Sequence, residues 1–221
     1  AVRIVFVSGT AVAHMIFSHV FYFDWARATG VIDGGPLGFM TWSIPVIVGS
    51  LAYDCVIGRG AAGAIRKLTV WSIGLMVFGY AISCLTAILS HANQLETAGT
   101  IWAWLARPPL LPPAGPIDMW TMSQQTGSVS YQLFGAGFSL AVYVLFVWLS
   151  DVRGLEWGLL RTLGQNALAA YIIHGLVIDC IHPFVPKDSP LWYIAIGFGV
   201  FFAITWWILK YLEKRGYYLR L

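Results

Sequence analysis

Charged residues are scarce in this chain of 221 residues: Asp, Glu, Lys and Arg make up 10% of it, whereas 58% of its residues are hydrophobic. A soluble domain carries about 25% charged residues, so this chain could not cover a water-facing surface. The composition therefore excludes a soluble globule and a disordered chain. The 13 Lys and Arg residues form no dense run, which excludes a nucleic-acid-binding protein. The remaining class is an integral membrane protein whose partner is the lipid bilayer.

The chain also has few cysteines and no pair of histidines at a spacing that suits a metal site. Cys55, Cys84 and Cys180 are scattered and form no C-x-x-C pair, so neither a disulfide framework nor a zinc site is predicted. His14 and His19 are five residues apart, about 140° around a helix, and do not share a face. We expect both to be hydrogen-bonded packing residues, and we predict no metal site.

Long hydrophobic runs, in contrast, are abundant. A membrane-spanning helix needs about 20 mostly apolar residues, and the qualifying stretches are continuous rather than alternating, which favours helices over barrel strands. The predicted fold is an all-α, polytopic transmembrane helix bundle of about six spans, in a single domain covering residues 1–221. The expected spans are residues 2–23, 37–57, 68–90, 131–150, 167–185 and 191–211.

The Lys and Arg residues indicate the orientation of these spans. Six spans place three of the 13 on one side, namely Arg27, Arg107 and Lys187, and the other ten on the opposite side. Cytoplasmic loops carry the excess of Lys and Arg, so both termini are expected to be cytoplasmic. Residues 91–130 then form a long outward loop, which we expect to lie on the membrane surface or to fold back over the bundle.

Two features inside the spans are informative. Asn166, Ala170 and His174 recur at every fourth residue, so one helix stripe carries Asn166 at the cytoplasmic mouth and a buried His174 about 12 Å deeper. This stripe is either a polar track for a ligand or a satisfied polar cluster between helices.

Small residues let membrane helices approach closely, and we assign four glycines to such packing. They are Gly74, Gly79, Gly135 and Gly137.

Three segments carry a resemblance to a known family. MSQQTGSVSYQLFGAGFSLAVYVLFVWLSDVRG and LRTLGQNALAAYIIHGLV resemble the C-terminal half of heparan-α-glucosaminide N-acetyltransferase and its bacterial relatives. DGGPLGFMTWSIPVIVGSLAYD is similar to a mid-protein segment of the bacterial relatives. The N-x-L-x-x-Y-x-x-H pattern, which includes Asn166, Tyr171 and His174, also resembles membrane sugar acyltransferases of the acyltransferase-3 type.

The resemblance implies a polytopic enzyme of a bacterial inner membrane that passes acetyl from cytoplasmic acetyl-CoA to an amino sugar outside. Acetyl-CoA would be a co-substrate, and Asn166, Tyr171 and His174 would line its route. The resemblance suggests further positions for the donor and the acceptor. Arg153, Arg161 and Gln165 would lie near the nucleotide, and Trp120, Ser123, Gln124 and Gln125 would hold the sugar.

One departure from the family keeps a second hypothesis open. Family members are about twice as long, and their catalytic histidine belongs to an N-terminal portion that opens with a motif resembling S-L-D-x-x-R-G. That motif does not occur in this sequence, so the family's catalytic histidine matches no residue here. The alternative is a non-catalytic transmembrane subunit of a larger respiratory or photosynthetic complex. A transporter would need broken helices in related halves, and the sequence shows no internal repeat.

Overall fold

The computed structural model describes residues 1–90, 105–113, 117–186 and 188–219. The chain divides into two compact units, residues Ala1–Arg153 and Gly154–Leu221. Across the described ranges, every regular element is helical, and five helical stretches are long and apolar enough to cross a membrane. This confirms the all-α class and a multi-pass arrangement of helices suited to a bilayer. A single domain over residues 1–221 stays a prediction.

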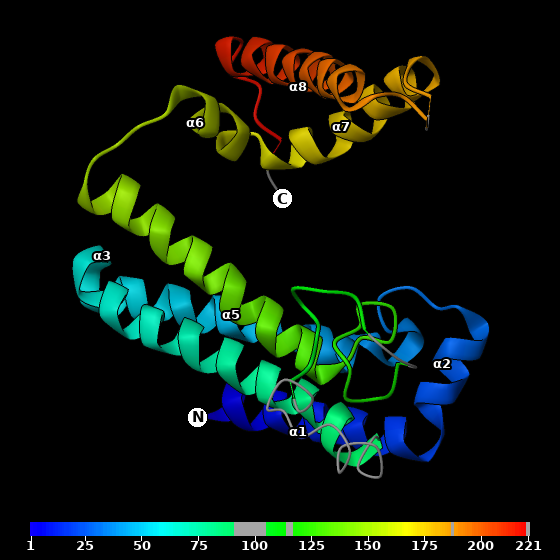
Figure 1. The fold of residues 1–221 in the computed structure, drawn as a ribbon. Coiled ribbons are helices and arrows are strands. Elements are labelled where there is room, and N and C mark those ends of the chain that lie inside the picture. The colour runs from blue at the N-terminus through cyan, green and yellow to red at the C-terminus, as the bar shows by residue number, and fades with distance from the viewer. Residues whose placement is uncertain (91–104, 114–116, 187, 220–221) are drawn as a thin grey trace. The chain divides into compact units, whose positions relative to one another are not determined.

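The first unit begins with one continuous, bent helical stretch. It consists of α1 (Val2–Phe17), a π-helical turn (Ser18–Tyr22) and α2 (Phe23–Thr29). Figure 1 shows α2 turned sharply away from α1, a bend that a π-helical turn commonly produces. The stretch ends at Gly30, whose φ of 63° is the left-handed conformation that favours glycine after a helix. The helix therefore extends beyond the predicted span 2–23.

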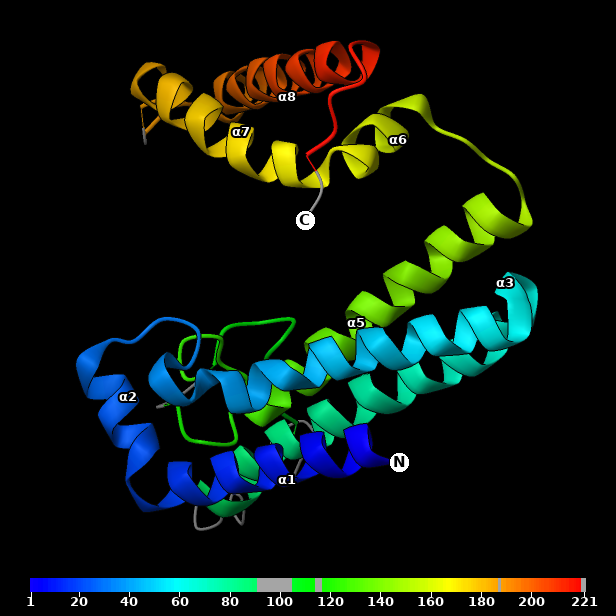
Figure 2. The ribbon, with the colours of Figure 1, turned by 180° about the vertical axis from the view of Figure 1, so that it is seen from behind.

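The second and third predicted spans form one helical element that folds back on itself at a kink. A short 3-10 turn (Gly35–Leu37) leads into α3 (Gly38–Leu85), which a π-helical turn extends over Thr86–Ser90. Inside α3 the backbone leaves helical geometry at Gly60, with φ 72° and ψ 162°. Figures 1 and 2 show the chain reversing direction in this part of α3. The two halves of this hairpin account for two spans, so the count of about six is confirmed.

Two side-chain contacts hold α1 along the first half of α3. The guanidinium of Arg3 contacts the carboxylate of Asp54 at 2.5 Å, and the hydroxyls of Thr10 and Ser43 are 3.2 Å apart. Because the residue numbers rise along α1 as they fall along α3, the two helices are antiparallel. The end of α1 that carries Arg3 therefore lies near the tip of the hairpin.

The fourth span packs its backbone directly against α3. It is formed by α5 (Val129–Phe146) and a π-helical extension (Val147–Val152). A Cβ on Gly79 would lie 2.7 Å from the backbone nitrogen of Phe134, and one on Gly137 would lie 2.8 Å from that of Met76. The hydroxyl of Ser72 also donates to the Gly137 carbonyl at 2.9 Å. These glycines allow the two backbones to touch.

Only part of the glycine prediction is therefore confirmed. Gly79 and Gly137 lie at the contact between α3 and α5, whereas a Cβ on Gly74 or Gly135 would meet nothing within 4 Å. The predicted role of the latter two in close packing finds no support in the first unit. Their spacing of five and two residues from the contacting glycines turns them to other faces of the helices.

The second unit contains a short helix and two long ones. They are α6 (Gly158–Gln165), α7 (Ala167–Ile181) with a 3-10 turn (His182–Phe184), and α8 (Leu191–Lys214). The last two match the predicted spans 167–185 and 191–211. α6 occupies a segment that was expected to be a connection, because eight residues are too short to appear as a hydrophobic run.

Substitution of Gly137 by leucine tests the contact between α3 and α5. A side chain there collides with backbone atoms that cannot move aside, so Gly137→Leu should lower the free energy of unfolding by about 1–3 kcal/mol or more. Gly135→Leu, two residues away with open space around its Cβ, is the control and should leave stability within error. Thermal unfolding in detergent measures the change in stability of both variants relative to wild type. Equal melting temperatures for the two variants would show that the contact contributes nothing.

Candidate functional site

The strongest candidate site in the first unit centres on a buried histidine. His14 lies in α1 and its side chain is 2% exposed. Its Nδ1 shares a hydrogen bond with the hydroxyl of Ser18 at 3.4 Å, and its ring meets that of Tyr22 edge-on at 5.7 Å between centroids. Its other ring nitrogen, Nε2, is buried and has no hydrogen-bond partner among the described residues. One nitrogen is therefore fixed, and the other has hydrogen-bonding capacity to spare.

His14 lines a small cavity beneath the described part of the outer loop. The lining also includes hydroxyl side chains, and the Thr126 hydroxyl is buried with no partner among the described residues. The cavity volume of about 10 Å³ matches the space that a single water molecule needs. The complete lining is His14, Met15, Ser18, Phe23, Met119, Thr126, Ser128 and Val129. Two buried polar groups that have no partner among the described residues thus line the same small cavity.

Tyr22, whose ring meets that of His14, and two glycines hold the segment that follows α2. The buried Tyr22 hydroxyl donates to the Gly34 carbonyl and accepts the amide hydrogen of Leu37 at 3.0 Å. Gly34 and Gly127 both have positive φ, and a Cβ on Gly34 would lie 3.1 Å from the α-carbon of Gly127. Only glycines permit this conformation and this approach. They bring the segment after α2 against the outer loop.

Hydrogen bonds join the outer loop to that segment. The amide of Gly34 donates to the Gln125 carbonyl at 2.9 Å, and the Gln124 side chain donates to the carboxylate of Asp33 at 2.9 Å. At the other end of the loop, Arg27 donates to the Ile117 carbonyl at 2.9 Å. These contacts attach residues 117–125 of the loop to α2 and to the segment that follows it.

Asp118 organises the turn that carries Trp120. Its carboxylate accepts the backbone amides of Trp120 and Thr121, at 3.0 and 2.9 Å, and the hydroxyl of Thr86 at 2.8 Å. The hydroxyl of Ser130 donates to the Trp120 carbonyl at 2.8 Å. The loop is therefore fixed to the last turn after α3 and to the first turn of α5.

The structure brings the four predicted acceptor-site residues into one part of this loop. Trp120 and Ser123 are half-buried, and Gln124 and Gln125 are exposed. Gln124 already uses its side-chain amide on Asp33, so a sugar would have to compete with that contact. The rest of the predicted loop, residues 91–104 and 114–116, lies outside the described residues. Binding of a sugar here stays a prediction.

The predicted track from Asn166 to His174 has two different environments. Asn166 is fully buried, and neither its side-chain oxygen nor its nitrogen has a partner among the described residues. His174 is exposed, contrary to the expected burial, and its Nδ1 contacts the Ala170 carbonyl at 3.2 Å. Tyr171 is 74% exposed, and its ring centroid lies 5.4 Å from that of His174. The stripe thus changes from a buried polar end to an open aromatic surface, because α8 covers only part of α7.

The three residues predicted to bind the nucleotide are divided between the two units. Arg153, at the end of the first unit, has its guanidinium carbon 5.0 Å from the ring centroid of Trp148. In the second unit, Arg161 pairs with Glu156 at 3.5 Å, and Gln165 is exposed at the end of α6. A shared nucleotide site formed by these residues stays a prediction.

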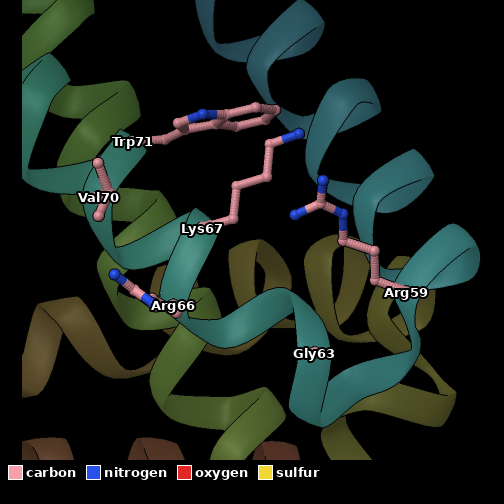
Figure 3. Close-up of a pocket in the computed structure, with 6 residues that line it drawn as sticks. All are labelled: Arg59, Gly63, Arg66, Lys67, Val70 and Trp71. Carbon is pink, nitrogen blue, oxygen red and sulfur yellow. The ribbon is translucent and has the colours of Figure 1, made fainter.

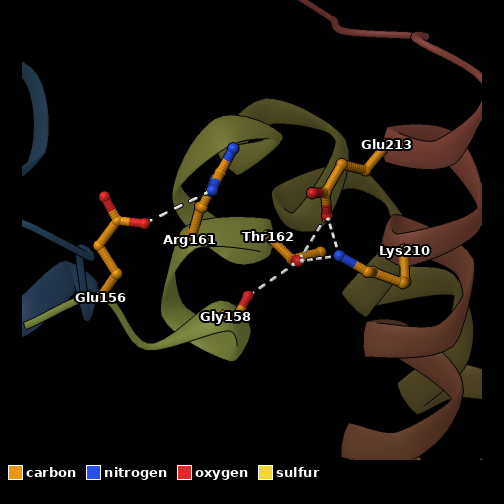
Figure 4. Close-up of polar contacts among 6 residues, drawn as sticks. All are labelled: Glu156, Gly158, Arg161, Thr162, Lys210 and Glu213. Carbon is orange, nitrogen blue, oxygen red and sulfur yellow. Dashed lines mark hydrogen bonds and ion pairs between the residues drawn. The ribbon is translucent and has the colours of Figure 1, made fainter.

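A polar network ties α6 to α8 in the second unit (Figure 4). The buried Thr162 hydroxyl lies 2.6 Å from the Glu213 carboxylate and 3.0 Å from the Gly158 carbonyl. A hydroxyl has one proton, and the charged acceptor at the shorter distance makes the stronger bond. Lys210 pairs with Glu213 at 2.9 Å. The network is an internal structural anchor, since its charges neutralise each other.

No protein-family model, curated protein or solved structure matches the chain. The prediction that His14 is a hydrogen-bonded packing residue agrees with its burial and its bond to Ser18. The sequence did not predict the cavity that His14 lines. The signal that could have indicated it is a histidine within an apolar span that also contains Ser18 and Tyr22 at helical spacing.

Tyr22→Phe tests how the segment after α2 is held in place. Loss of the hydroxyl leaves the Leu37 amide and the Gly34 carbonyl without their partner, which should cost about 1–3 kcal/mol of unfolding free energy. Tyr53→Phe is the control, because Tyr53 is 63% exposed. Thermal unfolding in detergent compares the two variants. If Tyr22→Phe unfolds like wild type, the hydroxyl does not stabilise the segment after α2.

Proposed function

We propose that the chain is a multi-pass membrane acyltransferase that passes acetyl from acetyl-CoA to an amino group on an outward-facing acceptor. The resemblance described above supports the reaction class. The single structural observation that supports it best is the buried His14, whose Nε2 has no described partner and whose side chain lines a cavity beneath the predicted acceptor loop. The sequence left the catalytic base unassigned, with Asn166, Tyr171 and His174 as a candidate polar track, and we now expect His14 to act as the base.

The proposed reaction needs a base and a group that holds the base in place. The amine nitrogen of the acceptor attacks the thioester carbonyl, a C–N bond forms and the C–S bond breaks. Nε2 of His14 takes the amine proton and returns it to the departing thiolate, which leaves as the free thiol. The hydrogen bond to Ser18 orients the imidazole through Nδ1. Hydroxyl groups such as that of Thr126 supply donors for the oxyanion.

The reaction requires the outer loop to move. In the arrangement described, the cavity has room for no more than one water molecule, so neither an acceptor nor an acetyl group fits. The contacts from Gln124 to Asp33 and from Gly34 to Gln125 are the ones that join the loop to the segment before α3. Opening breaks these two hydrogen bonds, and closure after binding would exclude water from the thioester.

His14→Gln tests the assignment of the base. Glutamine retains hydrogen bonding at this position but cannot take up the proton, so acetyl transfer from acetyl-CoA to glucosamine should fall by about 100-fold or more. His19→Gln is the matched control, since His19 is in the same helical stretch and is exposed. Release of free thiol from acetyl-CoA, followed with a thiol reagent, measures the rate for the full chain in detergent.

Three results bear on the proposal in different ways. Equal rates for His14→Gln and wild type would exclude His14 as the base. A loss of activity in His174→Ala, with His14→Gln active, would return the role to the predicted track. Absence of thiol release from the wild-type chain with every amino sugar tested would exclude catalysis by this chain alone.

A second candidate function is a non-catalytic subunit of a larger membrane complex. One observation favours it: within the second unit by itself, His174 and Asp179 are both exposed on α7, and ionisable groups within a span normally face a polar partner or a water-filled cavity. A neighbouring subunit could supply that partner. Purification in mild detergent distinguishes the two functions, because a stable monomer with transfer activity contradicts the subunit role.

A further inference from the structure

The tip of the α3 hairpin carries a basic pocket that plays no part in the proposed function. The pocket has a volume of about 370 Å³ and is drawn in Figure 3. A second pocket of about 320 Å³ shares Arg59, Lys67 and Trp71 with it. The residues that line the first pocket are Arg59, Gly63, Arg66, Lys67, Val70 and Trp71. None of these lining residues is acidic.

Two cations converge in the space that the pockets share. Figure 3 shows the guanidinium of Arg59 and the ammonium of Lys67 directed toward each other, whereas Arg66 points to the other side. The Lys67 Nζ atom lies 4.6 Å from the ring centroid of Trp71, so the aromatic face holds the ammonium in position. Two like charges directed into one space repel each other, and an anion between them would remove that repulsion.

No carboxylate of the described chain supplies that anion. Asp54 lines the second pocket, but its carboxylate is bound to Arg3 at 2.5 Å. Within the described ranges, Arg59 and Lys67 form no ion pair. Both cations therefore face the pocket with their charge available to a ligand.

The pocket lies where a hairpin of two predicted spans turns, which places it at a membrane–water interface. Tryptophan and basic residues are typical of this depth. Apolar side chains beside the tip are exposed, including Ile57 at 68% and Val70 at 62%. The surface therefore offers positive charge at the level of lipid headgroups and an apolar wall at the level of acyl chains.

We propose that this pocket binds the phosphate group of an anionic phospholipid. The guanidinium of Arg59 supplies a fork of donors that matches phosphate oxygens, Lys67 adds a second positive charge, and the apolar wall accommodates an acyl chain. A soluble phosphorylated molecule presents the same phosphate chemistry, but it has no use for the exposed apolar wall. The proposal is independent of acetyl transfer, so either can fail without the other.

The test measures lipid retention by the full chain. Wild type and the double variant Arg59→Gln/Lys67→Gln are purified in detergent with added phosphatidylglycerol or phosphatidylcholine, and bound lipid is counted by native mass spectrometry. We expect wild type to retain phosphatidylglycerol in preference to phosphatidylcholine, and the double variant to bind it about tenfold more weakly. Lys214→Gln/Arg215→Gln removes two charges from the end of α8 and should leave retention unchanged.

Two further measurements make the result decisive. Retention by wild type should weaken as salt rises, because exposed charges are screened, and this holds even if the double variant fails to fold. Adenosine 3′,5′-bisphosphate, added as a soluble phosphate source, should not displace the lipid. Equal retention of both lipids by wild type, or equal retention by wild type and a folded double variant, overturns the proposal. Displacement by the soluble bisphosphate overturns the phospholipid as the source.

Discussion

Direct contact between helix backbones is the constraint on which the rest of the first unit depends. Lipid tails are as apolar as leucine, so burial of apolar area contributes little to the association of membrane helices. Close packing of the helices has to stabilise the association instead. α5 and the second half of α3 meet this requirement at Gly79 and Gly137, where a side chain would overlap backbone atoms. The Ser72 hydroxyl adds a hydrogen bond at the same contact. This packing holds α5 beside α3, and the side chain of Ser128 caps the start of α5, where the preceding loop ends.

The position of that loop determines the environment of His14. The loop is joined to the segment before α3 through Gln124 and Gln125, and a buried tyrosine hydroxyl supports the same segment from below. With the loop closed, the imidazole is cut off from bulk water and retains a nitrogen with no described partner. A buried polar group in this condition costs free energy. An unsatisfied buried polar group is commonly explained by a bound water molecule or by a catalytic role.

The two ends of the first unit differ in chemistry. The hairpin end carries Arg59 and Lys67, whose charges face a surface pocket. The loop end carries mostly neutral donors and acceptors, together with Asp33 and Arg27, which are bonded to the loop. The two proposals follow this difference: an anion is proposed at the hairpin end, and an uncharged polar group beneath the loop.

The sequence by itself determined the class of protein and the position of its hydrophobic segments, because helix length and hydropathy are local properties. It did not predict α6 or the continuation of the first helix to Thr29, since short polar helices resemble connections. It also could not assign burial: spacing shows that Asn166 and His174 share a face, but not how far a neighbouring helix covers that face. Only the tertiary structure decided that His174 is exposed while His14 is enclosed. The physical reason is that burial depends on which helices pack together and how each is rotated, and these follow from contacts between residues far apart in the chain.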